Sequence, residues 1–125
     1  MSVPVTVKMP AGPMNAMPLR LFISGLAARV GFDIETIEDI KTVVSESCVL
    51  LFSGIKNGVF TMHAETSGGI SIFASVSDAD YDECTHQDTF ELSRMIIESL
   101  ADESSIDEDK NGRVTGVHVS FKLGD

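Results

Sequence analysis

The chain has 125 residues, a length typical of one domain, and 43% of them are hydrophobic, which is a globular composition. Nine Lys and Arg residues against 19 Asp and Glu residues give a formal charge of −10. This acidic balance argues against binding to DNA, RNA or an anionic membrane, because those partners attract clustered basic side chains. Most of the negative charge lies between Asp78 and Asp109, which predicts a solvated acidic face or a surface that attracts a basic partner and repels polyanions.

The first residues show no signal peptide, and no apolar run approaches the length of about 18 residues that a membrane-spanning helix needs. We therefore expect a cytoplasmic protein. Two cysteines, Cys48 and Cys84, stand in no metal-type spacing. Cys48 lies within an apolar run, which predicts a buried, reduced thiol.

In the first half of the chain, the alternating residues 3–7 predict a strand. Apolar residues at helical spacing then predict a helix that begins after a cap at Asn15 and ends at Gly31. Asp33 can cap a second helix, whose apolar stripe over residues 37–51 follows the helical period.

In the second half, the Asn-Gly pair at 57–58 predicts a turn, and two alternating runs around the Gly-Gly pair at 68–69 predict a hairpin. Residues 78–87 are polar and predict an irregular segment. A third helix is expected over 92–100 and a closing strand over 113–123.

The order strand, helix, helix, strand, strand, helix, strand predicts a single α/β domain. We expect a two-layer α/β sandwich: a mixed, mostly antiparallel sheet with helices on one face.

The segment 107–112 matches the opening of a calcium loop, with Asp107, Asp109 and Asn111 at alternating positions before a Gly. The twelfth position is His118 instead of the bidentate Glu that calcium prefers. The flanking residues also predict strands rather than helices, so we expect a plain hairpin tip and no metal site here.

Among the carboxylates, Glu46 stands off the apolar stripe of the second helix. A carboxylate at that place is either a base above a ligand cleft or a surface residue, and the pattern leaves both interpretations open.

The run PLRLFISGLAARVGFDIETIEDIKTVVSESC, residues 18–48, resembles the anti-sigma-factor serine/threonine kinases, bacterial regulators in the histidine-kinase-like ATPase (GHKL) superfamily. The resemblance rests on an Arg-bearing first helix, the short G-F-D link and the segment I-E-D-I-K-T-V-V-S-E. It extends more loosely to residues 76–80, 96–103 and 115–119, and it implies the histidine-kinase-like ATPase form of the sandwich.

In that family, one helix carries a Glu that acts as the base and, four residues later, an Asn that holds magnesium. The corresponding residues here are Glu46 and Leu50. A Leu side chain has no lone pair to offer a hard cation, so the resemblance implies a vestigial base and no metal.

The other nucleotide positions of the family are mostly substituted. Asp78 matches the Asp that binds adenine, but Asp80 replaces the Gly two residues on. Glu91 and Ser93 stand where a Gly-x-Gly opens the third helix and cradles phosphate. Gly116 matches the Gly of the last motif.

Only residues 81–90 separate the second and third motifs, too few for the mobile ATP lid of the family. The resemblance therefore implies a pseudokinase: one domain over residues 1–125, with a shortened or missing lid, that regulates by protein binding without ATP or magnesium as cofactors. Two alternatives are an active ATP-dependent anti-sigma serine kinase and a small-molecule sensor that uses the cleft beside Glu46, Leu50 and Asp78.

By the same resemblance, the expected partner is a sigma factor or an anti-anti-sigma-type protein, and the chain is expected to form a homodimer. The family's first helix and its approach contribute to partner binding. This implies a role for Arg20 and for Met14 and Met17, whose soft side chains suit an adaptable contact surface.

Overall fold

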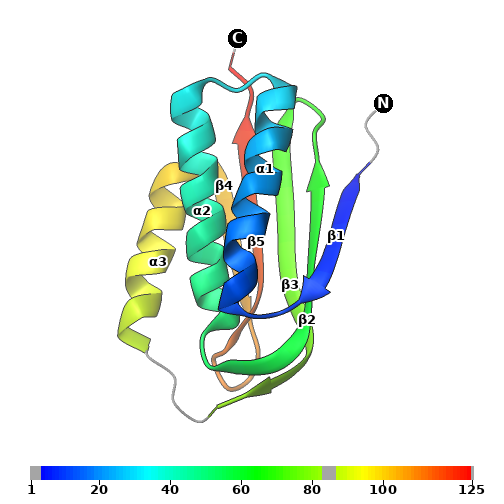
Figure 1. Cartoon of the computed structure of the whole chain (residues 1–125). Helices are drawn as coiled ribbons and strands as arrows, with labels where there is room; N and C mark the ends of the chain where they lie inside the picture. The colour runs from blue at the N-terminus through cyan, green and yellow to red at the C-terminus, as the bar shows by residue number, and fades with distance from the viewer. Residues whose placement is uncertain (1–3, 83–86, 125) are drawn as a thin grey trace.

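The computed structural model describes residues 4–82 and 87–124 and has two layers, a five-stranded sheet and three α-helices that cover one of its faces (Figure 1). The elements in chain order are β1 (Val5–Pro10), the short 3-10 helix η1 (Pro13–Asn15), α1 (Ala16–Val30), α2 (Ile34–Phe52), β2 (Ile55–Glu65), β3 (Gly69–Tyr81), α3 (Gln87–Leu100), β4 (Glu103–Glu108) and β5 (Val114–Lys122). The strands are ordered β1-β2-β3-β5-β4, and each neighbouring pair is antiparallel. The predicted two-layer α/β sandwich is therefore confirmed, with a sheet that is antiparallel throughout the described strands instead of mixed.

The ends of the first two helices follow the predicted local chemistry. Gly31, with φ of 111°, takes the left-handed conformation that closes α1, and its N–H donates to the carbonyls of the last turn. The Asp33 carboxylate accepts a hydrogen bond from the Thr36 amide over 2.8 Å and caps α2. Asn15 occupies the N-cap position of α1, but its side chain donates to the Pro10 carbonyl instead of capping the helix.

Two sequence predictions about the strands were wrong, and a third strand was predicted correctly but with a different end. Asn57 and Gly58 lie inside β2, where the register with β3 shifts, so they form an irregularity of a strand and not a turn. The predicted first strand is present as β1 and runs to Pro10. Val3 lies outside the described residues, as does Cys84. Strand β3 continues to Tyr81, through residues expected to be irregular.

The segment 107–112 forms the tip of a hairpin, as predicted, and joins β5 to the unpredicted strand β4. The Asp109 carboxylate accepts hydrogen bonds from the backbone N–H groups of Asn111 and Arg113, which fixes the turn. Among the described residues, no group of three or more His, Cys, Asp or Glu side chains is placed to hold a metal ion.

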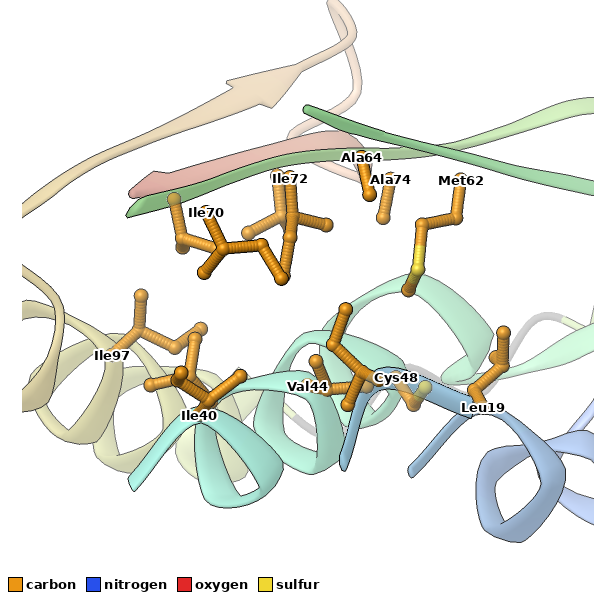
Figure 2. Close-up of a cluster of buried hydrophobic side chains, with 14 of the residues drawn as sticks. Leu19, Ile40, Val44, Cys48, Met62, Ala64, Ile70, Ile72, Ala74 and Ile97 are labelled. Atoms are coloured by element: carbon orange, nitrogen blue, oxygen red, sulfur yellow. The ribbon is translucent and has the colours of Figure 1, made fainter. Parts of the chain in front are cut away.

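The hydrophobic core fills the space between the sheet and the helices. Figure 2 shows Met62, Ile70 and Ile72 pointing from the sheet toward Ile40 and Val44 on α2. The buried core residues are Leu19, Ile23, Leu26, Ala27, Phe32, Ile40, Val43, Val44, Cys48, Leu50, Leu51, Phe52, Phe60, Met62, Ala64, Ile70, Ile72, Ala74, Ile97, Val114, Val117, Val119 and Phe121. Since side chains alternate along a strand, the residues between the buried ones, such as His63, Phe73 and His118, lie on the opposite face of the sheet. In the described ranges, no helix is both long and apolar enough to cross a membrane.

Candidate functional site

The residues that correspond to the family's base and magnesium ligand lie on α2, on the side that contacts α3. Ser93 of α3 donates a hydrogen bond from Oγ to Glu46 Oε1 over 2.8 Å. Ser93 is only 1% exposed, whereas Glu46 is half-buried. Glu46 is therefore not a free surface carboxylate, because one of its oxygens is hydrogen-bonded to the neighbouring helix.

Leu50 lies one turn after Glu46 and is 2% exposed within the hydrophobic core. Its side chain fills space by packing. The hydrogen bond between Glu46 and Ser93 joins α2 and α3 at this place, and Leu50 belongs to the core beside it.

The two positions that match the phosphate-binding glycines lie inside α3. The helix begins at Gln87, so Glu91 and Ser93 are its fifth and seventh residues. Only the first few N–H groups of a helix lack an intrahelical acceptor, and those of Glu91 and Ser93 are past that point. These amides are therefore engaged within the helix, and the Glu91 side chain is exposed.

Asp78 and Asp80 lie near the end of β3, and both are exposed. Asp78 has φ of 52°, a left-handed conformation that Asp tolerates better than most residues. Asp80 pairs with Asn57 at the irregular start of β2. Beyond them, the Arg113 guanidinium lies 4.3 Å from the centre of the Tyr81 ring, and burial raises the pKa of the Tyr81 hydroxyl despite the opposing effect of Arg113.

Gly116 lies on β5, on the sheet face away from the helices. A Cβ added there would come within 2.9 Å of Asp107 Oδ2 and 3.0 Å of Phe73 Cε1. A larger residue would collide with these atoms, so the packing of the sheet itself explains the glycine at this position. Glu46 and Ser93 lie in the helical layer, so the structure does not bring Gly116 together with them.

The residues expected to bind a partner lie at the start of α1. Met14 is 82% exposed, Met17 is 66% exposed, and Arg20 is also exposed. Leu21, which sequence reasoning missed, is 67% exposed and lies one turn after Met17 on the same side of the helix. We call Met14, Met17, Arg20 and Leu21 the α1 surface.

A largely apolar groove of about 330 Å³ lies beside the start of α1. It is lined by Pro13, Ala16, Ser45, Cys48, Val49, Phe52 and Ser53. Burial raises the pKa of the Cys48 thiol to about 12, so this lining residue is neutral at physiological pH.

The comparisons with known proteins found similarity to serine-protein kinases named RsbW. The chain is 46% identical to the enzyme of Bacillus pumilus over 44 residues and 43% identical to that of Bacillus subtilis over 44 residues. It is 40% identical to the enzyme of Listeria monocytogenes over 62 residues. No family model matches the chain.

These matches are partial on both sides. They cover 35% of this chain and 27% of the B. pumilus enzyme, and 46% of this chain and 40% of the L. monocytogenes enzyme. The chain therefore matches less than half the length of these curated relatives. The similarity agrees with the kinase family that the sequence resembles.

Proposed function

We propose that this chain is a degenerate relative of the anti-sigma serine kinases that regulates by binding another protein, without ATP, magnesium or phosphotransfer. The observation that carries the proposal is the α1 surface: three large apolar side chains left in water beside an apolar groove. Burying one such side chain against a partner contributes about 1.5–3 kcal/mol.

The contact between α2 and α3 supports the absence of nucleotide binding. A metal–triphosphate needs an oxygen ligand for the cation and free backbone N–H groups for the phosphates. Position 50 offers a buried hydrocarbon, and the amides of Glu91 and Ser93 lie within α3. The Glu46 carboxylate accepts a hydrogen bond from Ser93 at Oε1, which ties this side chain to α3 and gives it a structural role.

The kind of partner follows from the resemblance and from the partial similarity to RsbW kinases. We propose a sigma factor or an anti-anti-sigma-type protein as the partner, and a homodimer as the assembly of this chain. Arg20 supplies a positive charge on an otherwise apolar surface of an acidic protein, which suits a partner with a carboxylate near its apolar contact residues.

Binding is tested with purified sigma factors and anti-anti-sigma-type proteins from the same genome, each titrated by calorimetry. Met17→Glu places a charge in the α1 surface and should weaken binding at least tenfold. Met95→Glu is the matched control, because Met95 is 65% exposed on α3 and outside the proposed surface. Equal effects of the two substitutions, or no binding by any of these proteins, would refute the proposed function.

Nucleotide binding is tested separately by thermal unfolding with millimolar Mg-ATP. The proposal predicts an unchanged Tm, since a ligand stabilises only the state to which it binds. A saturable rise in Tm, or labelled phosphate transferred to a serine of a partner, would instead support the active kinase.

A further inference from the structure

The sheet face opposite the helices carries a row of side chains in register across all five strands. Thr6 pairs with His63, His63 with Phe73, Phe73 with His118, and His118 with Ser105. Paired residues of antiparallel strands lie side by side on one face of a sheet. These five residues, which we call the ring row, therefore cross the sheet at one level.

The rings of the ring row are stacked and anchored at both ends. The His63 and Phe73 ring centres are 6.4 Å apart at 13°, and those of Phe73 and His118 are 4.1 Å apart at 18°. His63 Nδ1 is 2.9 Å from Thr6 Oγ1, and His118 Nε2 donates to Asp107 Oδ2 over 3.1 Å. The rings thus form a fixed ridge across the strands.

A second row lies two residues along each strand from the ring row. Glu65 pairs with Ser71, Ser71 with Ser120, and Ser120 with Glu103. The two serines are small and lie between two longer carboxylate side chains. We call these four residues the serine row. The short serine side chains in its middle stand less far from the sheet than the rings do, and its two ends are acidic. The ridge runs alongside it.

The ridge and the serine row line a groove of about 530 Å³. That volume is within the range of small-molecule sites. Glu65 and Glu103 stand on β2 and β4, which are three inter-strand steps apart, so their backbones are separated by about 14 Å at about 4.8 Å per step. The groove therefore presents two negative charges at a set spacing with hydroxyl groups between them.

We propose that this groove binds a linear aliphatic diamine or polyamine whose terminal amines are spaced to reach both Glu65 and Glu103. Each ammonium group would donate to one carboxylate, as charge-assisted hydrogen bonds favour. The chain between them would lie over Ser71 and Ser120, whose hydroxyl oxygens can accept from the inner amine N–H groups of a polyamine. Its methylenes would contact the edges of the rings in the ridge.

The same geometry disfavours other ligand classes. An anion would meet Glu65 and Glu103 at the two ends of the groove. A sugar or planar ring would need an open aromatic face, but imidazoles flank both faces of Phe73. Lys122 lies beside Glu103, with its Nζ 4.0 Å from Glu103 Oε1. Both side chains of that pair are well exposed, so the ion pair is weak and an amine can replace it.

Calorimetric titration with diamines of equal charge and different length tests the spacing. Diaminobutane, diaminooctane and diaminodecane carry the same two charges, so unspecific attraction to an acidic protein affects them alike. We expect diaminodecane and spermine to bind at least fivefold more tightly than diaminobutane. Equal affinities for all three diamines, or no saturable binding of spermine at millimolar concentration, would refute the proposal.

Substitutions locate the site. Glu65→Gln and Glu103→Gln should each weaken diaminodecane binding at least fivefold, and Lys122→Gln should strengthen it about twofold by freeing Glu103. Glu98→Gln on α3 is the matched control, since Glu98 is an exposed carboxylate in the other layer. An equal loss in the Glu98 variant would show adventitious charge binding and overturn the assignment. The groove lies on the face away from α1, so either result leaves the proposed partner binding standing.

Discussion

Replacing Leu50 with Ala tests whether the Leu50 side chain stabilises the core by packing or lines an open cleft left from the family's nucleotide site. Leu50 is 2% exposed in the core, and removing a buried Leu side chain typically costs about 2–5 kcal/mol. We expect a loss of about 3 kcal/mol in the free energy of unfolding. For 125 residues the unfolding entropy is about 0.26 kcal/mol/K, so the Tm should fall by about 11 °C.

Urea unfolding followed by far-UV circular dichroism measures this loss, since the chain has no Trp to report by fluorescence. Val49→Ala is the matched control, because Val49 is the preceding residue of the same helix and is 39% exposed. It should cost less than about 1 kcal/mol. A loss for Leu50→Ala as small as that for Val49→Ala would mean that the Leu50 side chain faces solvent and that the packing explanation is wrong.

Leu50→Asn extends the same test by placing an amide oxygen where the family has one. A buried amide without a partner should make this variant at least as unstable as Leu50→Ala. Mg-ATP should not restore its stability, because the neighbouring Glu46 is bonded to Ser93. Recovery of several degrees of Tm at millimolar Mg-ATP would show that the helices still open onto a nucleotide site.

Three other predictions concern single groups in the helical layer. Ser93→Ala removes the hydrogen bond to Glu46 and should lower the free energy of unfolding in urea by about 1–2 kcal/mol. Glu46→Gln keeps an acceptor and should lower it less. Equal losses in the two variants would contradict the hydrogen bond. Burial raises the pKa of Cys48 to about 12, so this thiol should resist alkylation by iodoacetamide at pH 8 in the native protein and react promptly in urea. Mass spectrometry of a Cys84→Ser variant measures the reaction. Rapid alkylation of the native protein would contradict the burial of Cys48. The pKa of Asp33 is lowered by hydrogen bonds from Thr36, so its contribution to stability is complete above the unfolded pKa of about 4 and is lost as the pH falls through the folded value. Since Asn caps helices at any pH, the Tm of the wild type should fall relative to that of Asp33→Asn between pH 5 and pH 2, and a constant difference would refute the role of the charge.

The parts of the fold that the sequence predicted are those encoded by short, strong local signals. The cap at Asp33, the left-handed Gly31 and the hairpin turn at 68–69 each depend on a few adjacent residues. Strand β4 was not predicted because its sequence, ESSIDE, has a single apolar residue and lies at the edge of the sheet. It forms a strand by pairing with β5, which no local periodicity records.

The site was harder to predict because its contacts join distant parts of the chain. Glu46 and Ser93 are 47 residues apart, and their bond depends on how α2 and α3 are rotated against each other. The ring row had a signal that could have been used: once the turn at 68–69 fixes the register, His63 must pair with Phe73. Phe73 also alternates with the buried residues of β3, at a position where a polar residue is expected. This pattern indicates that the outer face of the sheet carries an aromatic side chain.

The substitutions at the nucleotide positions are physically coupled rather than independent. Burial of the Leu50 side chain in the core contributes about 1.5–3 kcal/mol. The contact between α2 and α3 also lets Ser93 satisfy the Glu46 carboxylate, a bond to a charged group that contributes about 1.5–3 kcal/mol at most. A nucleotide that reopened this contact would have to offset about 3–6 kcal/mol, which is a factor of about 10²–10⁴ in affinity. On the proposed function, we therefore expect that restoring a single oxygen ligand does not restore nucleotide binding, whereas the α1 surface stays available to a protein partner.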